Sequence, residues 1–155
     1  MRRRSVSSSI SVIAAAVLLS GAACNSGSTA PADDLAAARA RWARKAPAAY
    51  TYTIRRACEC LPESSGPVSV AVRNRVVVSR QYTPSGAAVT AQYADIFPAV
   101  EGLFSIIETA IANGTKPLTV DYHPTLGYPL RIALGDPAVD APLYIVSGFL
   151  PGLSP

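Results

Sequence analysis

Two alternating segments on either side of a turn constrain the fold of this chain more than any other feature. Apolar and polar residues alternate over 118–122 and again over 128–134, and the turn His123-Pro124-Thr125-Leu126-Gly127 separates them. Period-two alternation on both sides of a turn predicts a β-hairpin with one buried face. The hairpin also contains the only histidine of the chain. A fold that includes it needs an antiparallel sheet.

The rest of the chain predicts two helices and four more strands. A first helix begins near Asp33 and Asp34, which can cap it, and ends at Pro47. A second helix, capped by Asp95, places apolar residues at 3.6-residue spacing as far as Ile111 and stops at Asn113-Gly114. The additional strands are expected at 49–60, 68–72, 76–82 and 143–150.

The order is therefore helix, three strands, helix, three strands. Antiparallel strands with helices to one side indicate an α+β domain whose sheet is covered by helices on one face. We expect residues 33–155 to form this single domain, since about 120 residues can bury a sufficient core.

The N-terminal segment has the features of an export signal. Arg2, Arg3 and Arg4 precede an apolar run over 10–19, which is too short to span a membrane. The following Leu18-Leu19-Ser20-Gly21-Ala22-Ala23-Cys24 resembles a bacterial lipoprotein box, although a bulky aliphatic residue is usual where Gly21 stands. We expect residues 1–23 to be a lipoprotein signal peptide, Cys24 to be acylated, and 24–32 to be a flexible linker. The alternative is an ordinary secretory signal cut near Ala23.

These features predict an exported protein, lipid-anchored in the cell membrane or outer membrane and facing the periplasm or exterior. The full chain has 14 basic and 10 acidic side chains, a formal net charge of +4, which falls to +1 without the three leader arginines. The basic residues over 39–45 fall in the later half of the first helix, where cations favour the helix dipole. Contact with a membrane surface is the alternative for them. Nucleic-acid binding needs a clustered basic face, and we do not expect it.

Several motifs resemble an uncharacterised family of small bacterial lipoproteins, classed as a domain of unknown function. Its pattern has a signal ending in cysteine, a helix with Trp, a Tyr-x-Tyr strand leading to cysteine, a helix with Phe, a Tyr-Asp-x-x-x-Gly-Tyr-Pro hairpin and an Asp-bearing turn before the last strand. The matching residues here are Cys24, Trp42, Tyr50, Tyr52, Cys58, Cys60, Phe104, Tyr122, Gly127, Tyr128, Pro129, Asp136 and Asp140. The resemblance implies a fold and a location, but no activity.

The chain departs from this pattern at His123, where the family tends to have Asp. If that Asp binds a ligand or metal, the site has changed here, whereas if it caps the turn the change is conservative. At the level of fold alone, the helix-and-three-strands plan is also similar to PepSY domains and to the β-lactamase-inhibitor-like fold. That similarity implies binding or inhibition.

Cys58 and Cys60 are the sharpest local chemical feature. In an oxidising compartment, with Cys24 acylated, two thiols remain and a disulfide is expected. Residues i and i+2 of a regular strand are about 6.5–7 Å apart at Cα, so a bend at Glu59 would be needed to bridge them. Such a small ring would be strained and more easily reduced. Free thiols, a redox role and a metal site remain open alternatives.

The sequence offers few residues for metal binding or catalysis. A zinc site could combine both cysteines with His123, but the spacing matches no zinc motif, and we predict no metal and no cofactor. His123 is expected to share an exposed strand face with Thr119 and Asp121, opposite Tyr122. The sequence has no nucleophile elbow, phosphate-binding loop or dinucleotide fingerprint. We therefore expect a protein that is not an enzyme.

The hypothesis from sequence is a membrane-anchored envelope lipoprotein that binds an unidentified envelope protein or small ligand. Its contact surface would be the sheet face or the hairpin residues Tyr122, His123, Gly127, Tyr128 and Pro129. Exposed aromatic side chains at the hairpin would favour the second surface, and their burial would weaken it. The alternative is a thiol-redox or metal-handling protein that uses Cys58 and Cys60.

Overall fold

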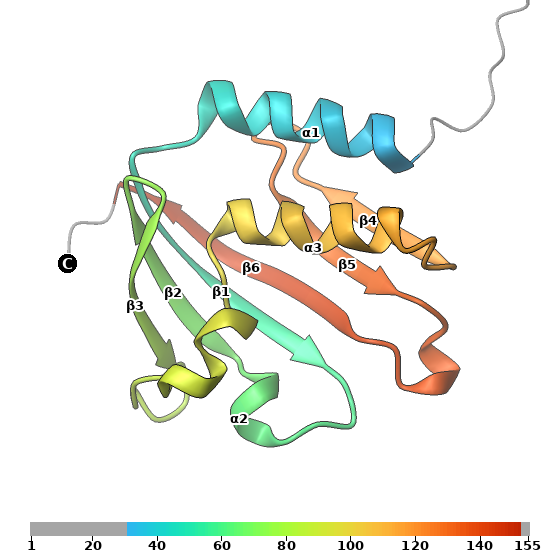
Figure 1. Cartoon of the computed structure of the whole chain (residues 1–155). Coiled ribbons are helices and arrows are strands. Elements are labelled where there is room, and N and C mark those ends of the chain that lie inside the picture. The colour runs from blue at the N-terminus through green and yellow to red at the C-terminus, as the bar shows by residue number, and fades with distance from the viewer. Residues whose placement is uncertain (1–30, 153–155) are drawn as a thin grey trace, which may run out of the picture.

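A computed structural model describes residues 31–152, which form one six-stranded antiparallel sheet with helices (Figure 1). The strand order is β3-β2-β1-β6-β5-β4, with β1 and β6 at the centre. The strands are β1 (Ala49–Ala57), β2 (Val68–Arg73), β3 (Val76–Tyr82), β4 (Leu118–Tyr122), β5 (Pro129–Leu134) and β6 (Leu143–Pro151). The helices are α1 (Pro31–Lys45), α2 (Pro62–Ser65) and α3 (Val100–Ala112), with 3₁₀ turns η1 (Ala91–Ile96) and η2 (Pro137–Val139). The predicted α+β class with an antiparallel sheet is confirmed.

The core forms where α1 and α3 pack against one side of the strands. Trp42 of α1, Leu103 and Ile107 of α3 and alternate strand residues are buried together. The strand residues of this cluster are Tyr50, Tyr52, Ile54, Val68, Val70, Val72, Ile132, Tyr144 and Val146. Their period-two spacing places them on one side of the sheet, and the same alternation leaves the intervening residues on the other.

A polar cluster fixes the two long helices to β1. Glu101, in the first turn of α3, accepts hydrogen bonds from Trp42 Nε1 at 3.0 Å and from the Tyr50 hydroxyl at 3.5 Å. The Tyr50 hydroxyl in turn accepts one from the Val100 N–H at 3.3 Å. Burial, and secondly the Glu101 carboxylate, raise the pKa of Tyr50 well above its usual range. The polar side-chain atoms of Trp42 and Tyr50 therefore both have a partner in this cluster.

Three predicted boundaries are corrected. Helix α3 begins at Val100 rather than at Asp95, because Pro98 disfavours helical backbone in the preceding residue and the chain forms η1 before it. Strand β1 ends at Ala57, because the chain bends at 58–60. Strand β2 extends to Arg73 rather than ending at residue 72, and the turn to β3 uses Asn74 and Arg75, at φ 49° and 67°.

The predicted linker also ends earlier than expected, because residues 31 and 32 already belong to α1. The predicted signal peptide and Cys24 lie outside the described residues. Within 31–152, no helix has both the length and the apolar character needed to cross a membrane.

Candidate functional site

The cysteine pair lies in a sharp bend directly after β1. Cys58 and Cys60 are at disulfide distance, and their Cα atoms are 5.2 Å apart. A regular strand would hold residues two apart about 6.5–7 Å from each other, so the bend at Glu59 is what brings them together. The expected bend, and the pairing it permits, are therefore both present.

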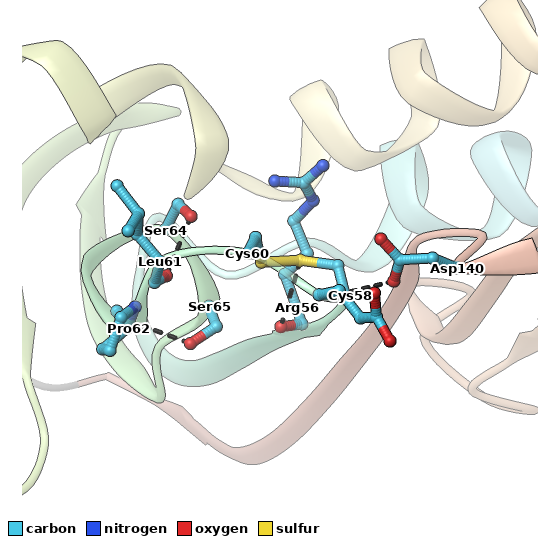
Figure 2. Close-up of a disulfide and its surroundings, with 9 residues drawn as sticks. Arg56, Cys58, Cys60, Leu61, Pro62, Ser64, Ser65 and Asp140 are labelled. Carbon is cyan, nitrogen blue, oxygen red and sulfur yellow. Dashed lines mark hydrogen bonds between the residues drawn. A yellow bond between two sulfur atoms is a disulfide. The ribbon is translucent and has the colours of Figure 1, made fainter.

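A second loop holds this bend in place. The Glu59 N–H donates to Oδ1 of Asp140 at 2.5 Å, and Asp140 follows η2 with a φ of 56°. Cys58 and Cys60 are half-buried, whereas Leu61 and Val139 are 63% and 75% exposed. Figure 2 shows the disulfide between Leu61 on one side and Asp140 on the other. The bond thus sits at the surface, with apolar side chains on the two loops around it.

Arg56 is the charged residue nearest to the cysteines along the strand. It pairs with Tyr144 of β6, and its Cζ lies 6.0 Å from the centre of the Tyr144 ring. Its carbonyl oxygen is 4.0 Å from Sγ of Cys58, and Figure 2 shows its side chain and the disulfide on the same side of the strand end. Its Nε is buried and has no hydrogen-bond acceptor among residues 31–152. Arg56 therefore brings a cationic side chain to the end of β1, and its Nε donor has no acceptor within the described residues.

The hairpin turn uses His123 as part of its own scaffold. His123 Nδ1 accepts hydrogen bonds from the N–H groups of Thr125 at 3.2 Å and Leu126 at 3.0 Å. Its backbone N–H donates to the Tyr128 carbonyl, and its carbonyl accepts from Gly127 N–H, both at 2.8 Å. The ring stacks on Tyr128, with centroids 4.9 Å apart. His123 thus caps the turn in the manner of an Asx residue.

The predicted exposed position of His123 beside Thr119 and Asp121 is wrong. The alternation holds over β4 as far as Tyr122, where the strand ends, and the extra residue of the β-bulge in the β4–β5 pairing, Leu130, lies in β5. Beyond Tyr122 the chain turns His123 toward Tyr128, and the imidazole is half-buried.

The other predicted hairpin residues support α1 rather than presenting a surface. Tyr128 is 6% exposed and stacks on Phe149 at 4.5 Å, and Pro129 is fully buried. Gly127 has a φ of 87°, and a Cβ there would collide with the Ala38 carbonyl oxygen of α1. Burial, and secondly the Asp34 carboxylate, raise the pKa of the half-buried Tyr122 to about 12.

The structure does not bring His123 to the cysteines. The disulfide lies where β1 pairs with the start of β6, while the hairpin turn packs near the end of β6 through Tyr128 and Phe149 (Figure 1). The two features are at opposite ends of the sheet, so a Cys₂His site does not form. The described residues contain no cluster of three or more His, Cys, Asp or Glu side chains that could hold a metal ion.

The second face of the sheet carries a row of charged residues that sequence alone did not reveal. Arg55 of β1 and Arg131 of β5 both pair with Ile145 of β6, and Asp121 of β4 pairs with Arg131. Strand register aligns these four residues across the sheet. None of the alternate strand residues on this face is buried: Thr51, Thr53, Arg55, Ser69, Ala71, Arg73, Gln81, Asp121, Arg131, Ala133, Ile145 and Ser147. We call this set the open face.

Two hollows among the described residues lie beside α1 and α3. The larger one, of about 510 Å³, runs between α1 and α3 and is lined by Leu35, Ile111 and the Arg39–Glu108 ion pair, whose charged atoms are 2.8 Å apart. The hydrogen bonds and charge of Arg39 lower the pKa of the Glu108 carboxyl. A second hollow, of about 310 Å³, adjoins Trp42 and Glu101. Their lining residues are not those of the open face.

The model of a family of unknown function, DUF6174, matches residues 34–149. The chain belongs to the DUF6174 family. The match runs from the first turn of α1 to Phe149, so the DUF6174 domain includes β1 to β5 and most of β6. No curated protein and no solved structure gives a significant match.

Membership in DUF6174 confirms the expected placement in a family of unknown function. The match does not concern the lipid anchor, the hairpin motif or the likeness to PepSY domains, and these stay predictions.

Proposed function

We propose that this protein is a membrane-anchored, non-enzymatic binding module of the cell envelope, and that its contact surface is the open face. The observation that supports this surface best is that the alternate strand residues opposite α1 and α3 are all at least partly exposed. The sheet face and the hairpin were the two candidates, and burial of Tyr128 and Pro129 leaves the sheet face.

The charges on this face favour an envelope protein with an acidic surface as the partner. Arg55 and Arg131 stand two strands apart, about 10 Å from each other, with Ile145 between them. An apolar residue flanked by arginines is typical of contact sites, because Arg combines charge with a planar group that pairs with carboxylates. Asp121 at the edge strand would fix the orientation of the partner by repelling its acidic groups.

The anchor supplies the location. Cys24 precedes the first residue of α1 by seven positions, a length of chain that reaches at most about 25 Å. Acylation at Cys24 would keep the domain close to the membrane and raise its effective concentration toward partners in the same membrane.

Anchoring is tested by fractionation of cells that express the full chain or its Cys24→Ala variant. We expect the natural chain to incorporate a labelled acyl chain and to sediment with membranes, and Cys24→Ala to lose both properties. Unchanged membrane partition of Cys24→Ala would exclude the lipoprotein assignment.

Binding through the open face is tested by photo-cross-linking in the native envelope. A photoreactive amino acid at Thr53, at the centre of the open face, should give a discrete cross-linked product, and one at the exposed Ala43 of α1 should not. Arg55→Glu with Arg131→Glu should abolish the product, whereas Arg44→Glu on α1 should retain it. Cross-links from both sites alike, or a product that survives the double reversal, would contradict this assignment.

A further inference from the structure

We infer that the Cys58–Cys60 pair is a thiol–disulfide exchange site that reacts with a dithiol protein of the envelope. This function lies at the end of β1, away from the row of Arg55, Ile145 and Arg131, and is independent of the binding role proposed for the open face. Three features of the described chain support it: access to the sulfur atoms, a cationic side chain two residues before Cys58, and exposed apolar residues on the two adjoining loops.

Access comes from the place of the pair in the fold. A structural disulfide typically joins elements distant in sequence, whereas this one closes a bend of three residues and joins no two elements. Cys58 and Cys60 are half-buried rather than enclosed, and the exposed Glu59 lies between them. The bend is held from outside the ring by the bond from Glu59 N–H to Asp140, so it can persist when the sulfur atoms separate.

The cation is Arg56. Its Nε is buried and lacks an acceptor within residues 31–152, and its side chain lies on the disulfide side of the strand. A thiolate formed by opening the disulfide would supply the missing negative charge. Neighbouring arginine or lysine side chains stabilise cysteine thiolates in this way and make them good leaving groups.

The contact residues are Leu61 and Val139. They are among the large apolar side chains most exposed to solvent, and they stand on the two loops that Glu59 and Asp140 join. Exposed apolar residues around a reactive group indicate contact with another protein. The chemical class of partner is therefore a protein dithiol set in an apolar surface.

The reaction balances without a cofactor. A partner thiolate attacks one sulfur of the Cys58–Cys60 bond, which forms a mixed disulfide and releases the other cysteine as a thiolate beside Arg56. The partner's second thiol gives up its proton and attacks the mixed disulfide. The partner leaves with a new disulfide, and Cys58 and Cys60 gain its two electrons and take up two protons. The reverse reaction with an oxidised protein restores the starting state.

The test uses the full chain with Cys24→Ala, so that only Cys58 and Cys60 react. Dithiothreitol serves as the dithiol probe, and the reduced pair is trapped with a mass-tagged maleimide while circular dichroism follows the fold. We expect reversible reduction of a domain that stays folded. The rate of alkylation of the reduced form by iodoacetamide is then measured from pH 5 to pH 10.

Arg56→Gln should lower the alkylation rate at pH 7 by about tenfold, since loss of an adjacent opposite charge shifts a thiol pKa by about one unit or more. Arg55→Gln is the matched control, because the neighbouring side chain points to the open face, and it should leave the rate within about twofold. The proposal is overturned if Arg56→Gln matches the unsubstituted protein, or if the pair is reduced only when the domain unfolds. Because the open-face test uses Arg55 and Arg131, failure of either proposal leaves the other standing.

Discussion

The hairpin turn and the cysteine bend lie at opposite ends of one sheet, and the chain uses their reactive side chains in opposite ways. His123 gives its Nδ1 to two backbone N–H groups and its ring to Tyr128, so its chemistry is fully engaged by the fold. The cysteine bend is held by the hydrogen bond from the Glu59 N–H to Asp140. The sulfur atoms bond only to each other, and the Arg56 Nε has no acceptor within the described residues. A reactive side chain is therefore free for function only where other groups hold its turn in place.

The largest effect should come from Gly127, where the hairpin touches α1. Gly127→Ala would place a methyl group against the Ala38 carbonyl and within 2.9 Å of the Arg41 Cβ, at a φ of 87°. We expect the free energy of unfolding to fall by more than about 3 kcal/mol, since strain and overpacking add. Urea denaturation measures it.

Gly86→Ala is the control for this prediction. Gly86 has a φ of 69°, but a Cβ there meets nothing within 4 Å. Its substitution should cost only about 1 kcal/mol, from the backbone conformation. Equal losses of unfolding free energy at Gly127 and Gly86 would mean that close packing of the hairpin turn against α1 does not stabilise the fold.

The disulfide in the cysteine bend should contribute less to the free energy of unfolding than Gly127 does. Cys58→Ser with Cys60→Ser removes a cross-link that closes only three residues, and the chain-entropy relation gives about 1.5 kcal/mol for so short a loop. Thermal unfolding of the double variant should be cooperative, with a melting temperature only several degrees lower. A loss of unfolding free energy as large as that of Gly127→Ala would mean that the disulfide supports the fold as much as the hairpin turn does.

Sequence patterns were sufficient for the sheet but not for its chemistry. Alternation predicted β3 and β4 with their observed bounds, because half-buried strands depend on local spacing. It failed at His123, since β4 ends at Tyr122 and the chain turns there toward Tyr128, and no local pattern marks this end. The same limit applies to Glu101, whose bonds to Trp42 and Tyr50 depend on how α1, β1 and α3 pack.

The row on the open face was also beyond sequence reasoning. Arg55, Ile145 and Arg131 are far apart in the chain and meet only through the pairing of β1, β6 and β5. That pairing joins the first strand to the last, a long-range contact that no turn signal predicts. In contrast, the bend at Glu59 could be predicted, because the geometry of a two-residue separation is local.

His123 allows the turn-capping interpretation to be tested directly. His123→Ala removes the acceptor of two N–H groups and a stacked ring, and should cost about 1 kcal/mol. His123→Asn or His123→Asp should recover most of that loss, because their side-chain oxygen can accept the same N–H groups. If neither variant is more stable than His123→Ala, the imidazole has a task other than capping, and the contrast with the cysteines fails.

The smallest effect concerns Tyr122 at high pH. Its pKa is raised to about 12 in the folded protein, against about 10 in an unfolded chain. The folded state therefore holds this proton to higher pH than the unfolded chain. Its contribution to the free energy of unfolding is complete below pH 10 and declines as the pH rises toward 12. Because Tyr122 is half-exposed, solvent screening reduces the contribution to about 0.5 kcal/mol.

The measurement is the stability difference between pH 8 and pH 11 in the natural chain and in Tyr122→Phe. Other buried tyrosines, Tyr50 and Tyr52 above all, also have raised pKa values and contribute to the alkaline loss in both proteins, so only the difference between the two reports Tyr122. We expect Tyr122→Phe to lose less stability over this interval, and the absorbance change near 295 nm to lack one late-ionising group. If the late part of the absorbance titration is the same in Tyr122→Phe as in the natural chain, the Tyr122 hydroxyl is exposed to solvent. The hairpin would then again be a candidate contact surface.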